Sequence, residues 1–215
     1  MNGDLTLVIG NKNYSSWSFR AWLALSLTGQ TFREILVPLD QPETRAAILA
    51  HSPTGLVPLL RHGDLAVWDS LAIGEYLAET FPEAGLWPRD SRHRALARAV
   101  TAEMHSGFPA LRAEFSMDMR RRRRVVPSQR AERDILRIQR IWAECLLTSG
   151  STAFLFGEPG LADCFYAPVV SRFVTYGVAL DHVAAAYVDR VTRWPLYRAW
   201  YEAAEKEPWD LGDHH

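Results

Sequence analysis

A ten-residue stretch, Phe81–Asp90 (FPEAGLWPRD), divides the chain into two parts with different patterns. Two prolines and a glycine lie within it, and residues of this kind interrupt both helices and strands. Short strand-like and helical segments alternate before this stretch, whereas only helical patterns follow it. The break predicts two domains, an α/β domain over residues 1–81 and an all-helical domain over residues 92–215, joined by a linker at 82–91.

The first part alternates between period-two and helical patterns. Strand patterns cover residues 5–9, 31–37, 57–61 and 65–68, and helix patterns cover residues 16–27, 43–51 and 70–79. Strands this short do not close a large barrel. The order βαβαββα therefore predicts a compact α/β sandwich.

The part beyond the linker contains helical patterns. Residues 92–115 form a long amphipathic stretch in which Pro109 predicts a kink. A second stretch repeats apolar residues at helical spacing: Ile135, Ile138, Trp142 and Cys145. Residues 161–176 are apolar almost all round, which is typical of a central, buried helix.

The composition excludes several classes of protein. The 215 residues are 48% hydrophobic and 23% charged, and the formal net charge is −1. A charge so close to zero does not favour binding to nucleic acid or to a membrane surface. No apolar run is as long as a membrane span, and the start MNGDLTLV lacks a basic region followed by an apolar core. We therefore expect a cytoplasmic protein.

Neither the cysteines nor the histidines show the spacing of a redox or metal site. Cys145 and Cys164 lie far apart among apolar residues, which predicts buried thiols rather than a redox pair. The seven histidines lack the HExxH pattern, so no metal is expected. The run Arg120–Arg124 falls between two helical patterns without interleaved aromatic residues, so we expect a solvated, mobile loop rather than a nucleic-acid contact.

Four short stretches add specific motifs to this organisation: YSSWSFRAWLAL, SPTGLVPLL, VWDSLAIGEYL and GLADCFYAPVV. Together with the two-part organisation, they resemble the cytosolic glutathione transferases, and the resemblance covers essentially the whole chain. It implies a thioredoxin-like N-terminal domain that binds glutathione and a helical domain that forms the electrophile site. It also implies a homodimer without a metal.

The segment SPTGLVPLL is similar to the N-P-x-G-x-V-P segment of this family. The resemblance implies a cis bond between Val57 and Pro58, a form that is rare even before proline and is typical of tight turns. The backbone N–H and C=O of Val57 would then pair with an extended peptide as with a sheet edge. The alternative is an ordinary proline at the start of an edge strand.

The segment VWDSLAIGEYL is similar to the acidic-serine pair that opens the third helix of the family. A helix N-terminus offers N–H groups and a partial positive charge to a carboxylate. The resemblance implies that Ser70 and its N–H bind the γ-glutamyl carboxylate of glutathione, with Asp69 beside the ammonium group. The alternative, compatible with the first, is that Asp69 only caps the helix.

The opening stretch YSSWSFR is similar to the S-S-C-S-W-R motif of the zeta class. A free thiol with a pKa of about 8.5 is mostly protonated at neutral pH, and a helix N-terminus stabilises the thiolate. The resemblance implies that the Ser15 hydroxyl donates to the glutathione sulfur, with Ser16 in support. The alternative is a serine N-cap. Trp17 stands where the motif has cysteine, which narrows the thiol pocket and counts against maleylacetoacetate isomerase activity.

Two further segments depart from the family in part. GLADCFYAPVV has Gly160 where the family has Ser or Thr, so Asp163 forms only half of the usual capping box. EMHSGFPAL resembles the E-x-H-x-G-F segment of beta-class enzymes, which places Met104 and His105 in the electrophile site. That class has lysine at the position of Ser106 and a catalytic cysteine, and this chain has neither. A histidine with a structural role is the alternative for His105.

These observations predict an enzyme that transfers the glutathione thiolate to a small electrophile. Two alternatives are left open. One is a glutathione-dependent cis–trans isomerase of the maleylacetoacetate or maleylpyruvate type, and the other is a non-catalytic interaction module with the same fold.

Overall fold

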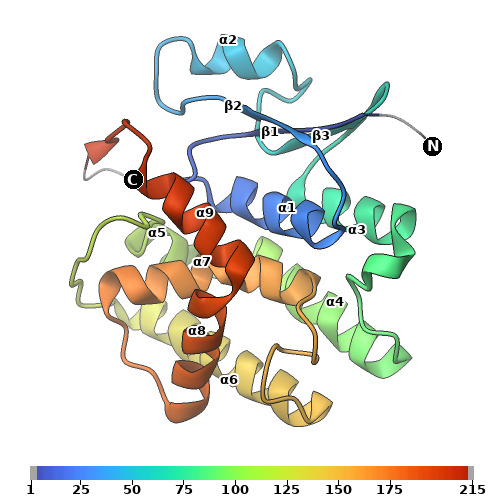
Figure 1. Ribbon diagram of the computed structural model, residues 1–215. Coiled ribbons are helices and arrows are strands. Elements are labelled where there is room, and N and C mark those ends of the chain that lie inside the picture. Colours follow the sequence, from blue (N-terminus) through green and yellow to red (C-terminus); the bar gives the residue numbers. More distant parts are fainter. Residues whose placement is uncertain (1–3, 213–215) are drawn as a thin grey trace.

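The computed structural model describes residues 4–212, which form a small sheet with helices followed by a group of packed helices (Figure 1). This architecture confirms the predicted fold class. The outer ends of the two expected domains, residues 1 and 215, lie outside the described part. A single-turn 3-10 helix, η1 (Pro82–Ala84), lies in the stretch predicted to be the linker.

The first part has the predicted order of elements. The strands are β1 (Leu5–Ile9), β2 (Arg33–Leu36), β3 (Leu59–His62) and β4 (Leu65–Val67). The helices are α1 (Ser16–Leu27), α2 (Thr44–Leu49) and α3 (Ser70–Thr80). β2 is shorter than predicted, and β3 begins at Leu59 rather than at residue 57, directly after the Val57-Pro58 pair.

β1 lies inside a four-stranded sheet of order β2-β1-β3-β4. It pairs in parallel with β2 and antiparallel with β3, and β4 is an antiparallel edge strand. Helices α1 and α3 cover one face of the sheet and α2 lies on the other (Figure 1). Because neighbouring side chains of a strand point to opposite faces, Leu7 joins the core beneath α1 and α3, whereas Val8 packs with Ile48 of α2.

The described elements of the second part are helices, as predicted, and an isolated β-bridge joins Phe154 to Gly157. Its helices are α4 (Ser91–Ser106), α5 (Pro109–Glu114), α6 (Gln129–Ser149), α7 (Leu161–Tyr176), α8 (His182–Arg193) and α9 (Pro195–Glu205). Helix α7 packs against α1, α4 and α8, and 15 of its 16 residues are buried, which confirms the predicted central helix. The predicted apolar stripe of α6 is buried as well: Ile135, Ile138, Trp142 and Cys145.

The stretch predicted as one kinked helix is two helices. α4 ends at Ser106 and α5 begins at Pro109, which lacks an N–H and suits the first position of a helix. Between them, a Cβ at Gly107 would lie 2.6 Å from the Glu103 carbonyl oxygen, and Phe108 has a positive φ of 60°. The left-handed residue redirects the chain, so the helix stops rather than bends.

The start of α7 explains the unusual glycine at its cap. The Leu86 carbonyl oxygen in the linker accepts the Leu161 N–H at 2.9 Å, and a Cβ at Gly160 would lie 2.9 Å from that oxygen. Asp163 Oδ2 accepts the Gly160 N–H at 3.0 Å, so the predicted half of the capping box is present. The close approach of the linker thus favours glycine over serine or threonine here.

The arginine run is not free of the rest of the protein, so the expectation of a solvated, mobile loop is wrong for its first residues. Arg120 donates to the Glu207 carbonyl oxygen at 2.7 Å. The Arg121 guanidinium lies 2.8 Å from the Asp210 carboxylate. These contacts join the run to the segment that follows α9.

The two cysteines are buried free thiols, as predicted. Burial raises the pKa of the Cys145 thiol to about 12, so this thiol is protonated at neutral pH. Within residues 4–212, none of the helices is long and apolar enough to cross a membrane, and no group of three or more His, Cys, Asp or Glu residues is arranged to hold a metal ion.

Candidate functional site

The loop between β1 and α1 turns the chain into the N-terminus of α1. The Asn11 carbonyl oxygen accepts the N–H groups of Tyr14 at 3.2 Å and Ser15 at 2.8 Å. Unpaired N–H groups and the helix dipole give the start of a helix a partial positive charge. This end of α1 is therefore suited to an anion such as a thiolate.

Ser15 is the N-cap of α1, and its hydroxyl is already used within the protein. Ser15 Oγ accepts the Ser18 N–H at 3.3 Å and donates to Ser18 Oγ at 2.7 Å. Ser18 Oγ in turn accepts the Gly10 N–H at 3.0 Å. The capping role is thus present, and a ligand sulfur would have to compete with Ser18 for the Ser15 proton.

Ser16 is the first residue of α1, and its hydroxyl is arranged differently. Ser16 Oγ accepts a hydrogen bond from Arg172 Nη2 at 3.2 Å. In the described structure, the Ser16 hydroxyl proton itself has no acceptor. A hydroxyl whose oxygen accepts from a cation is polarised and becomes a better donor.

The Val57–Pro58 bond is cis, as the resemblance to the family implied. Pro58 is buried and Val57 is half-buried, immediately before β3. A second cis bond, between Trp68 and Asp69, immediately precedes α3. The pairing of the Val57 backbone with a peptide stays a prediction.

Ser70 opens α3 and is fully buried. Its hydroxyl has no hydrogen-bond partner among the described residues, while Asp69 Oδ1 caps the helix by accepting the Leu71 N–H at 3.0 Å. A buried polar group without a partner costs about 1–3 kcal/mol. An acceptor bound at this helix start would remove that cost, and a carboxylate suits both the hydroxyl and the helix N–H groups.

His105 brings together residues from both parts of the chain. Its Nε2 lies 3.1 Å from Asp69 Oδ2, and its ring packs edge-on against Trp17 with 5.3 Å between centroids. The pKa of His105 is lowered, and burial is the main cause. The charge of Asp69 opposes this shift, whereas the charges of Arg20 and Arg112 increase it. His105 is therefore mainly neutral at pH 7 and joins two of the predicted site residues.

The Met104 side chain does not lie beside His105 at the candidate site. Its side chain is 1% exposed and packs in the main hydrophobic core. Its carbonyl oxygen accepts a hydrogen bond from the Arg112 guanidinium. The expectation that the Met104 side chain lines the electrophile site therefore does not agree with its burial.

Sequence reasoning missed a cluster of three arginines beside Trp17, formed by Arg20, Arg112 and Arg172. The guanidinium carbons of Arg20 and Arg112 lie 4.4 and 4.9 Å from the centroid of the Trp17 ring. Arg20 is 1% exposed, and its Nε and Nη1 have no hydrogen-bond partner among the described residues. Burial, followed by the charges of Arg112 and Arg172, holds the pKa of Arg20 well below its ordinary value.

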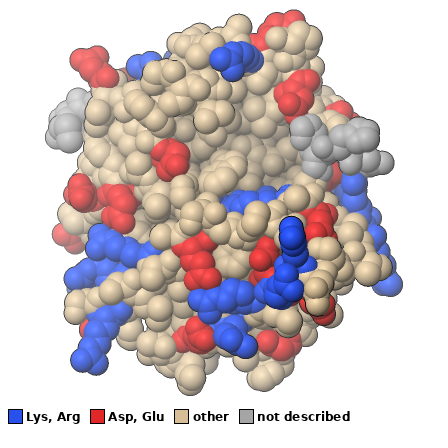
Figure 2. All heavy atoms as spheres, turned by 180° about the vertical axis from the view of Figure 1, so that it is seen from behind, with Lys and Arg blue, Asp and Glu red and all other residues tan. Residues whose placement is uncertain are grey.

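The sequence did contain a signal for two members of this cluster. Arg20 and Arg172 each stand in a helix that is otherwise mostly apolar (SWSFRAWLALSL and LADCFYAPVVSRFVTY). Arginine is rarely fully buried unless it is paired. The cluster is thus a concentration of positive charge suited to an anionic group. Figure 2 shows a hollow near the middle of the rear face with basic side chains along its lower border.

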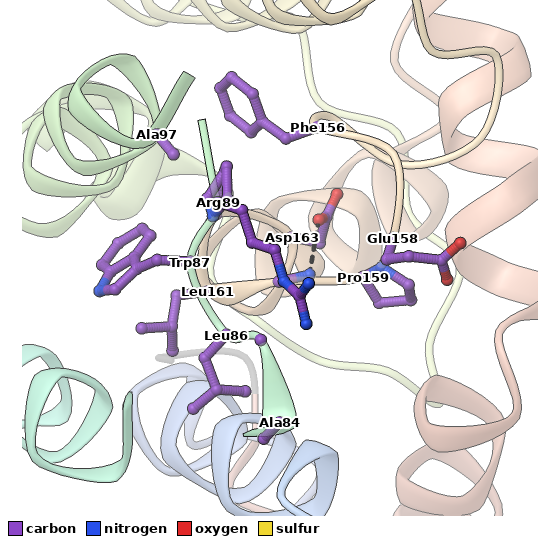
Figure 3. A pocket seen from close by; sticks show the side chains of 14 residues that line it. Ala84, Leu86, Trp87, Arg89, Ala97, Phe156, Glu158, Pro159, Leu161 and Asp163 are labelled. Atoms are coloured by element: carbon purple, nitrogen blue, oxygen red, sulfur yellow. Dashed lines mark hydrogen bonds between the residues drawn. The ribbon is translucent and has the colours of Figure 1, made fainter. Parts of the chain in front are cut away.

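A separate cavity of about 330 Å³ lies between the linker and the start of α7 (Figure 3). Trp87, Phe156 and Leu161 are among its walls, and the Asp163 carboxylate that accepts the Gly160 N–H also borders it. Of the described residues that line this cavity, none is a predicted site residue. It results from the packing of the linker against α7 rather than from the candidate site.

Comparison with known proteins identifies the family. The family model described as "Glutathione S-transferase, N-terminal domain" matches residues 14–80, and "Glutathione S-transferase, C-terminal domain" matches residues 94–203. The chain belongs to the glutathione S-transferase family.

Individual members of this family resemble the chain over different lengths. It is 45% identical to glutathione S-transferase 1 of Dianthus caryophyllus, but the match spans only 38% of each chain. It is 32% identical to the maleylacetoacetate isomerase of Pseudomonas aeruginosa over 78% of this chain and 81% of that protein. The fold matches a glutathione transferase homolog from Burkholderia, solved with bound glutathione, with a TM-score of 0.73 and 24% identity, over 95% of this chain and 100% of that one.

Proposed function

We propose that the chain transfers the thiolate of glutathione to a small electrophile. The observation that carries this proposal is the Ser70 hydroxyl, which is fully buried and lacks a partner in the described structure at the N-terminus of α3. The γ-glutamyl carboxylate of glutathione would accept from this hydroxyl and from the first N–H groups of the helix. Asp69 would attract the neighbouring ammonium group, and the Val57 backbone would pair with the extended peptide.

Glutathione supplies a thiol, which is nucleophilic as the thiolate. The N-terminus of α1 and a serine hydroxyl stabilise the negative charge on sulfur, and water takes the proton, because neither serine acts as a base. The sulfur electron pair forms the new bond to carbon. In a substitution, the electron pair of the broken bond departs with the leaving group. In an addition, the negative charge that forms on the electrophile takes a proton from water.

The contacts within the loop favour Ser16 as the residue that donates to sulfur. Ser15 already donates to Ser18, whereas the Ser16 hydroxyl proton has no acceptor among residues 4–212 and its oxygen is polarised by Arg172. This reverses the order expected from the motif, with Ser15 holding the helix start and Ser16 contacting the ligand. Trp17, 37% exposed, and His105 would form the wall beside the electrophile.

We further propose that the protein is a cytoplasmic homodimer. Leu65 in the edge strand β4 and Trp68 directly after this strand are each 45% exposed and offer apolar surface to a second copy. Buried free thiols suit the reducing cytoplasm. Light scattering combined with size-exclusion chromatography tests the dimer, and a monomeric mass would refute it.

Retention of the full chain on immobilised glutathione tests the main proposal. Elution by free glutathione, together with conjugation of an activated aryl halide, would support it. A protein that binds no glutathione would instead support the non-catalytic interaction module.

A second candidate is a glutathione-dependent cis–trans isomerase of the maleylacetoacetate or maleylpyruvate type. The observation that favours it is the Arg20 guanidinium beside Arg112 and Arg172, whose Nε and Nη1 have no hydrogen-bond partner among the described residues and which would attract a carboxylate of the substrate. The relative from Pseudomonas aeruginosa is a maleylacetoacetate isomerase. Trp17 counts against this candidate, because a bulky indole replaces the cysteine of the zeta motif.

One measurement separates the two candidates. An isomerase converts a maleyl-type substrate while the amount of free thiol stays constant, whereas a transferase consumes thiol with each turnover. Replacing Arg112 by glutamine should weaken inhibition by maleate if the cluster binds carboxylates. Equal inhibition of the wild type and Arg112→Gln would remove the cluster from the substrate site.

A further inference from the structure

The segment that follows α9 binds the loop between β1 and α1. Glu207 is 8% exposed, and its carboxylate accepts two consecutive backbone N–H groups of that loop. Oε1 accepts the Lys12 N–H at 2.7 Å and Oε2 accepts the Asn13 N–H at 3.1 Å. One side chain near the C-terminal end of the described chain thus satisfies two donors beside the candidate thiol site. Figure 1 shows α9 beside α1 and the C-terminal segment near the start of α1.

Other contacts fix the same loop from two sides. Trp200 Nε1 in α9 donates to the Lys12 carbonyl oxygen at 2.9 Å. Asn13 Nδ2 donates to Asp118 Oδ1 at 2.9 Å, and Asn13 Oδ1 accepts the Arg120 N–H at 3.0 Å. The loop is therefore held between α9 with its following segment and the stretch that links α5 to α6.

The charged groups around Glu207 favour an ionised carboxylate, although burial acts against it. Burial raises the pKa of Glu207, and the N–H groups of Lys12 and Asn13 oppose that rise. The positive charges of Lys12 and Arg120 oppose it as well, and Arg120 also donates to the Glu207 carbonyl oxygen at 2.7 Å. Hydrogen bonds to an ionised acceptor are short and strong, so this contact restrains the loop more than a neutral one would.

We propose that Glu207 is a positioning residue for the thiol site: it sets the loop so that Ser15 caps α1 and Ser16 presents its hydroxyl to the glutathione sulfur. This inference rests on the function proposed above. Only Tyr14 lies between the anchored Asn13 and Ser15, so a shift at the anchor reaches Ser15 two residues later and Ser16 three residues later. Glu207 touches no reacting atom and acts through the backbone of the loop.

Three variants of the full chain test this inference. Glu207→Gln keeps the shape but replaces one acceptor oxygen by an amide group that faces an N–H donor. Glu207→Asp keeps the charge but withdraws the carboxylate from the loop by one methylene. Glu205→Gln, an exposed residue at the end of α9, is the matched control.

The readouts are the ultraviolet absorbance of the thiolate of bound glutathione against pH, the pH–rate profile of conjugation, and amide hydrogen exchange of the loop. In Glu207→Gln we expect a higher pKa of the bound thiol and faster exchange at Lys12 and Asn13. We expect a loss of kcat at pH 7 of about 10- to 100-fold, the range that small displacements of reacting groups produce, with a smaller change in KM for glutathione. Glu205→Gln should match the wild type.

The outcomes separate this inference from the function on which it rests. A wild-type protein that binds no glutathione thiolate refutes both. A normal wild type together with Glu207 variants whose thiol pKa and kcat equal those of Glu205→Gln refutes only the positioning role, even if those variants are less stable. If Glu207→Gln does not fold, Glu207→Asp supplies the same comparison.

Discussion

Replacing Ser16 by alanine should raise the pKa of the thiol of bound glutathione. A hydrogen bond to a charged group contributes about 1.5–3 kcal/mol. One pKa unit corresponds to about 1.4 kcal/mol, so the loss of this bond should raise the thiol pKa by about one to two units. The sign follows because the hydroxyl stabilises only the thiolate, and its removal therefore favours the protonated thiol.

The rate of conjugation should follow the thiolate fraction. When the pKa lies above the working pH, a rise of one unit lowers that fraction about tenfold, and the deficit should shrink as the pH increases. The variant also removes the acceptor of Arg172 Nη2, which lies 3.2 Å from Ser16 Oγ. We therefore expect a parallel loss of about 1–3 kcal/mol in the free energy of unfolding. Rates at saturating glutathione across pH and the thiolate absorbance measure the first effect, and chemical denaturation measures the second.

Ser15→Ala is the matched control, one residue earlier. It removes the cap contact with the Ser18 N–H and should cost about 1 kcal/mol of stability while the pH–rate profile stays in place. If Ser15→Ala shifts the pH–rate profile and Ser16→Ala leaves it unchanged, Ser15 is the donor to sulfur, as the resemblance to the zeta motif implied. If neither variant moves the profile, the hydroxyl hypothesis is refuted, and the N-terminus of α1 or His105 stabilises the thiolate.

Three further predictions concern binding and stability. Ser70→Ala should weaken glutathione binding by about 1–3 kcal/mol, because a carboxylate loses a donor; unchanged affinity in titration calorimetry would remove Ser70 from the site. Gly160→Ser should lower the Tm although serine is a good cap, because the new Cβ would lie 2.9 Å from the Leu86 carbonyl oxygen; a higher Tm would contradict this. Burial raises the pKa of Asp163 from 3.8 to about 6, so the folded state binds this proton more tightly than the unfolded state. Its contribution to stability should be full below about pH 4 and lost as the pH rises through about 6, and Asp163→Asn should lack this slope in denaturation series across that range.

Local patterns were sufficient for most elements of the fold. The bounds of α1 and α7, Ser16–Leu27 and Leu161–Tyr176, are those that the spacing of apolar residues predicts. The cis bond at Val57–Pro58 was expected only from the resemblance to the family, because the local sequence also allowed an ordinary proline at a strand edge. The helix bounds depend on neighbours within a few residues, where caps and helical spacing act directly on the backbone.

The candidate site followed from the sequence only in part. Motifs pointed to Ser70 and to the two serines at α1, but the hydrogen bond from Ser15 to Ser18 depends on side-chain rotamers that the pattern does not specify. The arginine cluster required the tertiary structure, because Arg20, Arg112 and Arg172 stand on α1, α5 and α7 and meet only when these helices pack.

The contacts that hold the loop between β1 and α1 depend most clearly on tertiary structure. The run Arg120–Arg124 has the composition of a solvated loop, because charged residues indicate only that a segment can lie in water. The partners of the arginine run depend on where α9 places the segment that follows this helix. Glu207 of that segment binds Lys12, from which it is separated by 195 residues of sequence. Local patterns carry no information about such a pair, because its energy arises from the burial and hydrogen bonding of groups that only the packed helices bring within 3 Å.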